Sequence, residues 1–517
     1  MRPLEIVIIA ILSLHVLSFF LKKEKRPAWL YWLPTVAAAI LVLHAITEGI
    51  RWQMYIAYLL TFIYLAFSIK SLFGSSKQSQ EQTKGSRIAG ILSGVLVIVL
   101  LGASLLIANL LPVSEPFSPT GKHQIGTSFF HLIDYDRKEV LTADSSDVRS
   151  LWVQAWYPAE TTKSFERVQV FSNSEKFMGD AFERVGWPSF MGSHVSLIKS
   201  HSYLDAPIKN GDEPFPVILF SHGYTGNLSS TPQIEELVSQ GYVVFSIAHS
   251  YESALSLNQA GEWISRESFN LYEDNSDTVR INPIIKSILA IKNRADSTTT
   301  TDYLSPLALT ENDKLQLDSL YGKWYPLARA RLKIWAADKS FVLNEVEQMQ
   351  RGEKKSIFKG KLDLKRVGAF GFSFGGGAAA LFNSIDERCL AAANLDGLTA
   401  GMMYADTLTH PYMLFMGDYA WNNNLTRGEW GSIGNSNPFY RIGIKGGIHG
   451  NIPAYLNNFS LQSKIGLIRP DVIDQYRAYE IYNSFLVAFF DRHLKGKEQQ
   501  KLLEGEERFE EVNFRVH

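Results

Sequence analysis

The stretch that decides the fold is VGAFGFSFGGG, Val367–Gly377. It begins with Val367–Phe370, a short apolar run of the kind found in buried parallel strands. A G-x-S-x-G pattern centred on Ser373 follows, and small residues continue after it. A strand that turns sharply into a helix holds such a serine in a strained conformation, and Gly371 and Gly375 let helix and strand approach closely. The stretch therefore predicts a nucleophile elbow with Ser373 as the nucleophile.

A nucleophilic serine needs a base, and four histidines follow Ser373 in the chain. His410 stands just before a predicted strand, at its wrong end, and His517 is the last residue. His493 lies in the last predicted helix, where we expect it to be solvated. His449 lies in a loop beyond the carboxyl end of a predicted strand, which is where a base should sit. We therefore expect His449 to be the base.

Two aspartates are candidates for the acid that orients this histidine and stabilises its protonated form. Asp396 ends the apolar run Leu390–Leu395, and Asp418 ends the next apolar run. The commonest hydrolase arrangement favours the later strand and hence Asp418. From the residues alone, either side chain remains a candidate.

An oxyanion hole needs two backbone N–H groups, and one comes from the residue after the nucleophile, here Phe374. The second should come from a loop after an earlier strand, and Ser221-His222-Gly223-Tyr224 follows the apolar run Val217–Phe220. We expect Tyr224 to be this donor. His222 precedes the serine in the chain, which argues against a role as base, and for His249 we expect a structural or substrate-lining role.

The rest of this region alternates between short apolar runs and helical patterns, which indicates βαβ units and a mostly parallel sheet. A polar stretch, 251–325, interrupts the alternation and is predicted to be a cap or lid insertion. The expected strands are 151–156, 217–220, 243–247, 367–370, 390–395, 412–415 and 440–444, and the expected helices are 234–240, 327–350 and 476–493.

The average composition hides two unlike parts. The 517 residues are 46% hydrophobic and 20% charged, with a net charge of −1, which argues against a nucleic-acid partner. The one cysteine, Cys389, permits no internal disulfide. Residues 1–111 contain ten basic and four acidic side chains, a net charge of +6, so the remainder carries −7.

The basic part contains four apolar runs, 4–21, 28–46, 54–69 and 88–111. A membrane-spanning helix needs roughly 20 residues, so we expect about four transmembrane helices in residues 1–111. Buried helices of a soluble core and, for the first run, a cleaved signal peptide are the less favoured alternatives. A proline-rich linker is expected at 112–124, and a second domain at 125–517.

The basic residues of the short loops predict the sidedness of these helices. The first and third loops are rich in lysine and arginine, whereas the second holds only Arg51. Loops one and three are therefore expected on the cytoplasmic side, which leaves the second domain outside the cytoplasm of a multi-pass protein of the cell membrane. Glu5, His15, His44 and Glu48 lie within or near the spans, mostly at their ends.

Several motifs together resemble the platelet-activating factor acetylhydrolase family, the lipoprotein-associated phospholipases and their bacterial relatives. They occur in order through most of residues 125–517 and leave the membrane part outside the resemblance. They are VQAWYPA (153–159), SHSYLDAP (200–207), PVILFSHGYTG (216–226), FVLNEVEQM (341–349), VGAFGFSFGGG (367–377), ANLDG (393–397) and FFDRHLKG (489–496).

The resemblance implies an α/β-hydrolase fold and a Ser–Asp–His triad. The family's acid follows the strand after the nucleophile helix, which selects Asp396, and the same likeness supports Tyr224 and Phe374 as oxyanion donors. Phe372 stands where the family often has a histidine, but this position is not catalytic. The insertion 251–325 looks divergent, so the substrate is less well defined than the reaction.

These observations predict a membrane-anchored serine carboxylester hydrolase that needs no metal or organic cofactor. A short-chain or modified phospholipid, or another lipid ester, is the expected substrate, and the bilayer is the expected partner of the N-terminal helices. The alternatives are a peptidase or acyltransferase that acts on cell-envelope material, and a non-catalytic binding module. The sequence does not indicate an oligomeric state.

Overall fold

The structure is a computed structural model of the whole chain. It describes residues 1–517 with the exception of 22–25, 74–83, 143, 172, 185, 212, 225, 227–230, 266–286, 288–289, 291–309, 398–407, 409, 418–436, 450–460, 462–463, 467–470, 499–500, 506–508 and 517. Most of the predicted cap, 251–325, therefore lies outside the described residues.

The chain folds into two compact units. The helical unit consists of residues 1–115, 173–198 and 455–468, and the sheet unit consists of residues 116–172, 199–454 and 469–517. The chain passes from the first unit to the second between Glu115 and Pro116, within the linker predicted at 112–124. Residues 173–198, which fall inside the range expected for the second domain, cluster with the helices.

The sheet unit is built around an 11-stranded sheet with the order β13-β12-β11-β10-β9-β5-β6-β2-β1-β4-β3. Its centre is parallel, because β6, β5, β9, β10, β11 and β12 each pair in parallel with the next. Strands β2 and β13 join the two sides of this block in antiparallel. The strands are β1 (Gln124–Lys138), β2 (Val148–Ala159), β3 (Arg167–Gln169), β4 (Lys199–Leu204), β5 (Phe215–Ser221), β6 (Val243–Ala248), β9 (Leu362–Phe372), β10 (Cys389–Leu395), β11 (Tyr412–Met416), β12 (Phe439–Ile444) and β13 (Val512–Val516).

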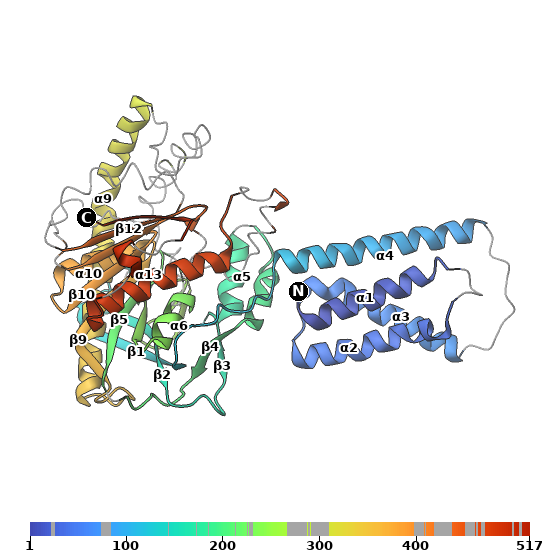
Figure 1. Cartoon of the computed structure of the whole chain (residues 1–517), viewed down its shortest axis with the longest axis horizontal. Helices are drawn as coiled ribbons and strands as arrows, with labels where there is room; N and C mark the ends of the chain where they lie inside the picture. Colours follow the sequence, from blue (N-terminus) through green and yellow to red (C-terminus); the bar gives the residue numbers. More distant parts are fainter. Residues whose placement is uncertain are drawn as a thin grey trace. The chain divides into compact units, whose positions relative to one another are not determined.

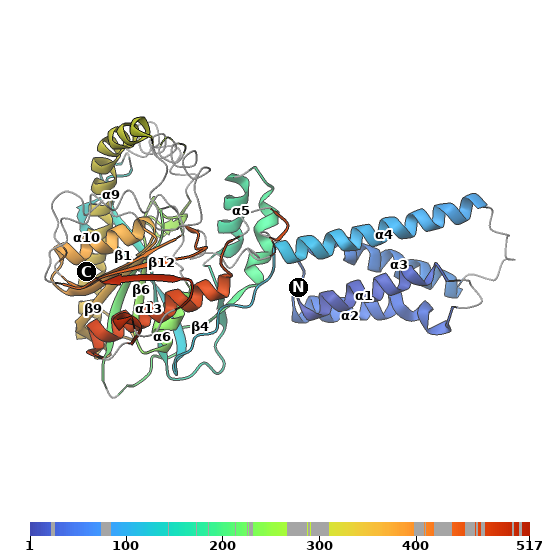
Figure 2. The same cartoon turned by 45° about the horizontal axis from the view of Figure 1, so that its top comes forward.

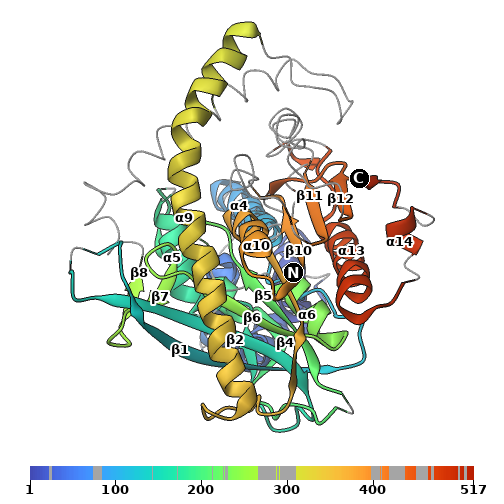
Figure 3. The same ribbon diagram turned by 90° about the vertical axis from the view of Figure 1, so that its left-hand side faces the viewer.

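Helices cover both faces of this sheet, as a parallel sheet requires. On one face α9 (Glu311–Arg351) and α10 (Phe374–Ile385) bury residues such as Leu332, Trp335 and Phe382 in one apolar cluster. On the other face α6 (Thr231–Ser239) and α13 (Gln475–Lys495) contribute to a second cluster. Figures 1 and 3 show these helices along the sheet. A short helix α14 (Lys501–Glu504) and a hairpin of β7 (Leu255–Leu257) and β8 (Trp263–Ser265) complete the described elements of this unit.

Each strand and helix that the sequence predicted in this unit is present. The apolar run 367–370 lies within β9, the run 390–395 lies within β10, and the helical pattern 327–350 lies within α9. The sequence did not predict β1, β3, β4 or β13. These strands lie at or near the edges of the sheet, and no continuous apolar run marks any of them.

The helical unit contains the four apolar helices α1 (Pro3–Ser18), α2 (Leu33–Thr47), α3 (Tyr55–Phe73) and α4 (Lys84–Leu110), which pack side by side (Figure 2). The short 3-10 helices η2 (Ala28–Trp32) and η3 (Trp52–Met54) precede α2 and α3. Among the residues that the structure describes, three segments are long and apolar enough to cross a membrane: Ala28–Thr47, Trp52–Lys70 and Ile88–Leu110. The first of the four expected spans is a shorter helix of 16 residues, so the number of crossings remains a prediction.

The outward surface of these helices supports membrane association. Large apolar side chains such as Phe62, Phe67 and Leu92 are exposed, while a separate apolar cluster that includes Leu12 and Leu41 fills the interior. A helix that is apolar on all sides suits a lipid environment and not a surface in water. This exposed apolar surface therefore supports association of the helical unit with a membrane.

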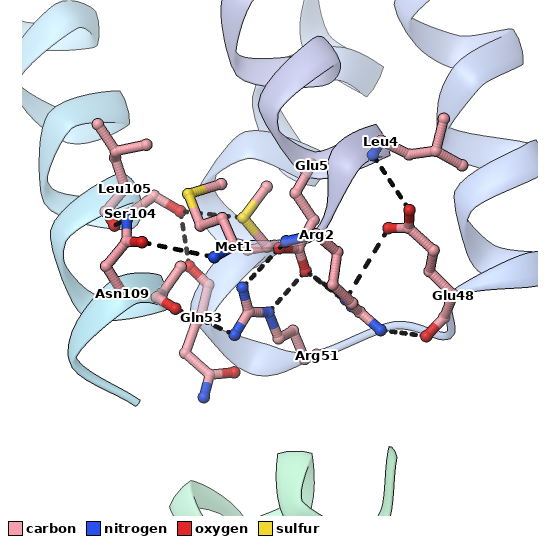
Figure 4. A network of polar contacts seen from close by, with 12 residues as sticks. Met1, Arg2, Leu4, Glu5, Glu48, Arg51, Gln53, Ser104, Leu105 and Asn109 are labelled. Carbon is pink, nitrogen blue, oxygen red and sulfur yellow. Dashed lines mark hydrogen bonds and ion pairs between the residues drawn. The ribbon is translucent and has the colours of Figure 1, made fainter. Parts of the chain in front are cut away.

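One end of the helical unit holds a buried polar network (Figure 4). Arg51 donates to both carboxylate oxygens of Glu5, at 2.6 and 2.5 Å, and both side chains are fully buried. Arg2 donates to Glu5 at 2.7 Å and to the carbonyl oxygen of Gly49 at 2.9 Å. Another guanidinium nitrogen of Arg51 contacts the carbonyl oxygen of Leu111 at 3.2 Å, at the end of α4. The network therefore holds the start of α1, the loop after α2 and the end of α4 at the same end of the helices.

The segment 173–198 contains α5 (Ser174–Arg184) and the 3-10 helix η4 (Ser189–Leu197). It contacts the loop between α2 and α3, because the indole nitrogen of Trp52 donates to the carbonyl oxygen of Met191 at 3.0 Å and the Trp52 and Phe190 rings meet at 5.8 Å. These contacts explain why the segment clusters with the helices.

Candidate active site

A sharp turn from strand to helix lies at the end of β9, at the position predicted for the nucleophile elbow. Ser373 stands between β9 and α10 with φ +55° and ψ −120°, which is a strained conformation for a residue with a side chain. A Cβ on Gly371 would lie 2.1 Å from the carbonyl oxygen of Gly375, and a Cβ on Gly375 would lie 2.1 Å from that of Ser221. Both positions therefore need glycine, and the helix can start directly against the strands.

Ser373, His449 and Asp396 come together although they are far apart in the sequence. The Nε2 atom of His449 lies 3.0 Å from Ser373 Oγ. The Nδ1 atom of the same ring lies 2.7 Å from Asp396 Oδ2. If Nδ1–H donates to the carboxylate, Nε2 is left to accept the hydroxyl proton, which is the arrangement that a Ser–His–Asp triad needs. We call these three residues the elbow set.

The acid is held by the neighbouring strand β11 and by the residue that follows it. Asp396 follows β10 directly, has φ +50°, and donates its own N–H to the carbonyl oxygen of Phe415 in β11 at 3.1 Å. Its Oδ1 accepts a hydrogen bond from the N–H of Gly417 at 2.9 Å, which leaves Oδ2 for His449. The alternative acid, Asp418, lies outside the described residues.

The elbow set is open on one side. Asp396 is buried, Ser373 is half-buried, and the His449 side chain is 37% exposed. The ring of Phe372, which stands where a histidine was expected from the family resemblance, lies 4.6 Å from the His449 ring. A reactant can therefore reach the serine and the histidine, while the carboxylate is shielded from water.

The loop that carries one predicted oxyanion donor passes beside the serine, and the other predicted donor follows the serine in the chain. We call His222–Tyr224, which follows β5, the oxyanion loop. A Cβ on Gly223 would lie 3.2 Å from Ser373 Cβ, so the loop passes directly beside the nucleophile. The rings of Tyr224 and Phe374 meet at 5.6 Å. Phe374 is the first residue of α10, where backbone N–H groups have no acceptor within the helix.

The remaining histidines are placed away from the elbow. His410 precedes β11, as expected, and His517 lies outside the described residues. The expectation that His493 is solvated was wrong: it is partly buried beside Tyr440, at 3.2 Å from the hydroxyl group, and burial lowers its pKa to about 4. His222, in the oxyanion loop, and His249, which follows β6, are both buried. Among the described residues, no group of three His, Cys, Asp or Glu side chains is placed to hold a metal ion.

The fold defines the class of protein first. The parallel sheet, the elbow after β9 and the covering helices are those of an α/β-hydrolase. A solved structure with the same fold, a ferulic acid esterase from Streptomyces cinnamoneus, matches with a TM-score of 0.53 and 20% identity over 78% of this chain and 99% of the esterase.

The sequence relatives narrow the class. The family model for "Platelet-activating factor acetylhydrolase, isoform II" matches residues 117–331. A platelet-activating factor acetylhydrolase from Cavia porcellus is 24% identical over 379 residues, which are 69% of this chain and 77% of that protein. The chain is thus similar to the platelet-activating factor acetylhydrolases, as its motifs predicted, and these findings support a hydrolase of lipid or other esters. The family model ends before Ser373, so the roles of the elbow residues depend on their geometry.

Proposed function

We propose that the protein is a membrane-anchored serine carboxylester hydrolase that acts on lipid esters through Ser373, His449 and Asp396. The observation that carries the proposal is the continuous pair of hydrogen bonds from Asp396 through His449 to a strained serine, at 2.7 and 3.0 Å. A non-catalytic binding module would gain nothing from a strained serine bonded to a histidine, because backbone strain is costly and persists where it serves a function.

The chemistry follows from the positions of these groups. Ser373 Oγ attacks the ester carbonyl carbon while His449 Nε2 takes its proton, and Asp396 stabilises the resulting imidazolium. The N–H groups of Tyr224 and Phe374 stabilise the carbonyl oxygen as it becomes negative. His449 then gives the proton to the leaving alcohol, and an acyl-enzyme remains on Ser373. Water, deprotonated by His449, attacks this acyl group, and the carboxylic acid leaves as Ser373 regains its proton.

The substrate class follows from the family likeness and the membrane part. The named relative is a platelet-activating factor acetylhydrolase, and anchoring in a membrane would keep the enzyme near lipid esters. A phospholipid with a short or modified sn-2 chain is therefore the preferred substrate in this proposal. Peptidase and acyltransferase reactions use the same kind of triad and are tested beside it.

The activity test compares the full-length protein with Ser373→Ala on p-nitrophenyl acetate. We expect turnover to fall by at least about 10⁴-fold, because loss of a nucleophilic serine removes most of the catalysis. Ser256→Ala, a change at a buried serine of the β7 hairpin, should leave turnover unchanged. Retained turnover in Ser373→Ala would refute the proposed nucleophile. Phosphatidylcholines with acetyl or palmitoyl sn-2 chains, peptide amides and acyl acceptors then identify the substrate class.

We also propose that the sheet unit lies outside the cytoplasm. The segments before Ala28–Thr47 and between Trp52–Lys70 and Ile88–Leu110 contain the basic residues, and basic loops stay on the cytoplasmic side. Three crossings then take the chain after Leu110 to the outer side, whether or not α1 also crosses. The number of crossings by α1 decides only the position of the N-terminus, and the network that joins Arg2 and Glu5 to the loop after α2 supports an outer position for it as well.

Cysteine accessibility tests this sidedness with low background, because the native Cys389 is buried. Lys355→Cys in the sheet unit and Lys70→Cys at the end of α3 replace exposed residues. A membrane-impermeant maleimide should label Lys355→Cys in intact cells and should label Lys70→Cys only after the membrane is opened. The reverse pattern would place the sheet unit in the cytoplasm.

A further inference from the structure

A second Ser–His–Asp arrangement lies beneath the oxyanion loop. Ser221 Oγ, at the end of β5, is 2.8 Å from Nε2 of His249, which follows β6. Nδ1 of the same ring is 2.7 Å from Oδ2 of Asp338, in α9. We call these three residues the buried set. All three are completely buried, so no substrate reaches them.

The charges around the buried set fix its protons. Burial opposes the ionisation of Asp338, but Arg149 beside it holds the pKa of Asp338 well below its usual range. Arg149 donates to both carboxylate oxygens, at 3.1 and 2.7 Å, and Arg137 donates to Oδ1 at 2.9 Å. Burial lowers the pKa of His249 to about 3, so the ring is neutral. Its Nδ1–H donates to Asp338, and Nε2 therefore accepts the hydroxyl proton of Ser221.

This chain of hydrogen bonds ends at the oxyanion loop. Ser221 is the residue directly before His222–Tyr224, so its fixed hydroxyl sets the point where the loop leaves β5. The loop is held again one residue later, because His222 Nε2 lies 2.6 Å from Ser253 Oγ and accepts from the N–H of His249 at 3.4 Å. The carbonyl oxygens of Ser221 and His222 both lie against Gly375 of α10.

Another side chain of helix α9, that of Trp335, supports Phe374, the predicted oxyanion donor that follows the nucleophile. Trp335, one turn before Asp338, stacks on the His249 ring at 3.8 Å and 11° between planes. Its ring also meets the ring of Phe374 edge-on at 5.0 Å. The indole N–H donates to Glu252 at 2.7 Å, which fixes the ring orientation. One helix therefore contacts the supports of both predicted oxyanion donors.

We propose that Ser221, His249 and Asp338 are positioning residues that hold the oxyanion loop in register with Ser373. The proposal rests on the function proposed above. The buried set carries out no chemical step itself. It fixes the N–H of Tyr224 at the place where the negative oxygen forms, and Asp338 anchors it to helix α9.

The test distinguishes a role of the buried set in positioning the oxyanion loop from a role in folding alone. Ser221→Ala and Asp338→Asn are compared with the wild type and with Ser256→Ala, whose native hydroxyl is equally buried but has no hydrogen-bond partner among the described residues. A fluorophosphonate probe provides two readouts: the fraction of Ser373 that is labelled measures folded sites, and the labelling rate depends on the oxyanion hole. Turnover of p-nitrophenyl acetate gives kcat and KM separately.

The removal of an oxyanion donor costs about 10²–10³ in kcat, and a displaced donor should cost less, about tenfold. We expect this fall in kcat and in labelling rate for Ser221→Ala and Asp338→Asn, with KM changed by less than about twofold and the labelled fraction near that of the wild type. Ser221→Thr, which keeps the hydroxyl group, should restore the rate, and Ser256→Ala should not differ from the wild type.

Two results would overturn the positioning role. In the first, Ser221→Ala folds fully and keeps the wild-type rates. In the second, every loss of rate equals the loss of labelled Ser373, which indicates a role in folding alone. A wild type whose Ser373 is not labelled, or a Ser373→Ala variant that keeps turnover, would instead refute the proposed function. The two failures are therefore distinguishable.

Discussion

The described part of the sheet unit contains two sets of serine, histidine and aspartate with nearly the same hydrogen-bond distances, and we propose a catalytic role for only one of them. In the elbow set the two bonds are 3.0 and 2.7 Å, and in the buried set they are 2.8 and 2.7 Å. Hydrogen-bond distances alone therefore do not identify a nucleophile.

Three differences separate the two sets. Ser373 has a strained backbone at φ +55° between a strand and a helix, whereas Ser221 is the last residue of a regular strand. The side chain of His449 is 37% exposed, whereas His249 is completely buried. The acid of the buried set is already paired with Arg149 and Arg137, so it is less able to stabilise an imidazolium. The proposed division into a reactive set and a positioning set therefore rests on exposure, strain and the charge around the acid.

The largest expected difference is at the two histidines. His449→Ala removes the proposed general base and should lower turnover by about 10⁴-fold or more. Because the site is open, added imidazole should enter and restore part of this turnover. His249→Ala should lower turnover by about 10²-fold at most per folded site, because a displaced oxyanion donor costs no more than a lost one, and imidazole should not restore it. Equal losses, or rescue of His249→Ala alone, would contradict the assignment of the two sets.

Substitution of Asp396 should mainly lower activity, whereas substitution of Asp338 should mainly lower stability. Asp396→Asn keeps the shape of the acid but favours the wrong histidine tautomer, and we expect kcat to fall by about 10⁴-fold with a small change in stability. Asp338→Asn leaves the buried Arg149 without one of its charged partners, and should lower the free energy of unfolding by about 3 kcal/mol or more. Urea unfolding and kcat measured on both variants check this. The comparison fails if Asp338→Asn loses more activity per folded site than Asp396→Asn.

The smallest expected effect is the pH dependence of stability. Burial lowers the pKa of His249 to about 3, against about 6.5 in an unfolded chain. Below pH 6.5 the unfolded state takes up a proton that the folded state does not, so the stability contributed by the neutral ring is complete above pH 6.5 and is lost as the pH falls. His249→Gln should therefore make the decrease in stability between pH 6 and pH 4 less steep, by about 1.4 kcal/mol per pH unit.

Urea unfolding of the wild type and His249→Gln across this range measures the difference directly. Burial raises the pKa of Glu235 to about 7 and gives a contribution of opposite sign, but this contribution is common to both proteins and cancels. Identical slopes for the two proteins would mean that His249 is charged in the folded state, and would contradict the proton arrangement of the buried set.

The sequence predicted the elbow set better than the buried set for a physical reason. Ser373 is marked by a local pattern, because the strained turn requires glycines on both sides. His449 and Asp396 each follow a strand of the parallel sheet, and the carboxyl ends of parallel strands meet at one edge. The choice of Asp396 over Asp418 came from the family resemblance, and Asp396 lies within hydrogen-bond distance of His449.

The buried set could be predicted only in part. Ser221 ends β5 and His249 follows the neighbouring parallel strand β6, so the same rule could have predicted their proximity. The position of Asp338 could not be predicted. This residue lies 89 residues beyond His249, on a helix whose charged residues look like those of any amphipathic helix. Its burial depends on how α9 packs against the sheet, which is a tertiary effect without a local signal.

The most direct test of which set is reactive is to map the fluorophosphonate adduct on the full-length wild-type protein by peptide mass spectrometry. One adduct per chain, on the peptide that contains Ser373, with Ser221 unmodified, is the expected result. An adduct on Ser221, or no adduct on Ser373 in folded protein, would contradict the division of the two sets into one that reacts and one that positions.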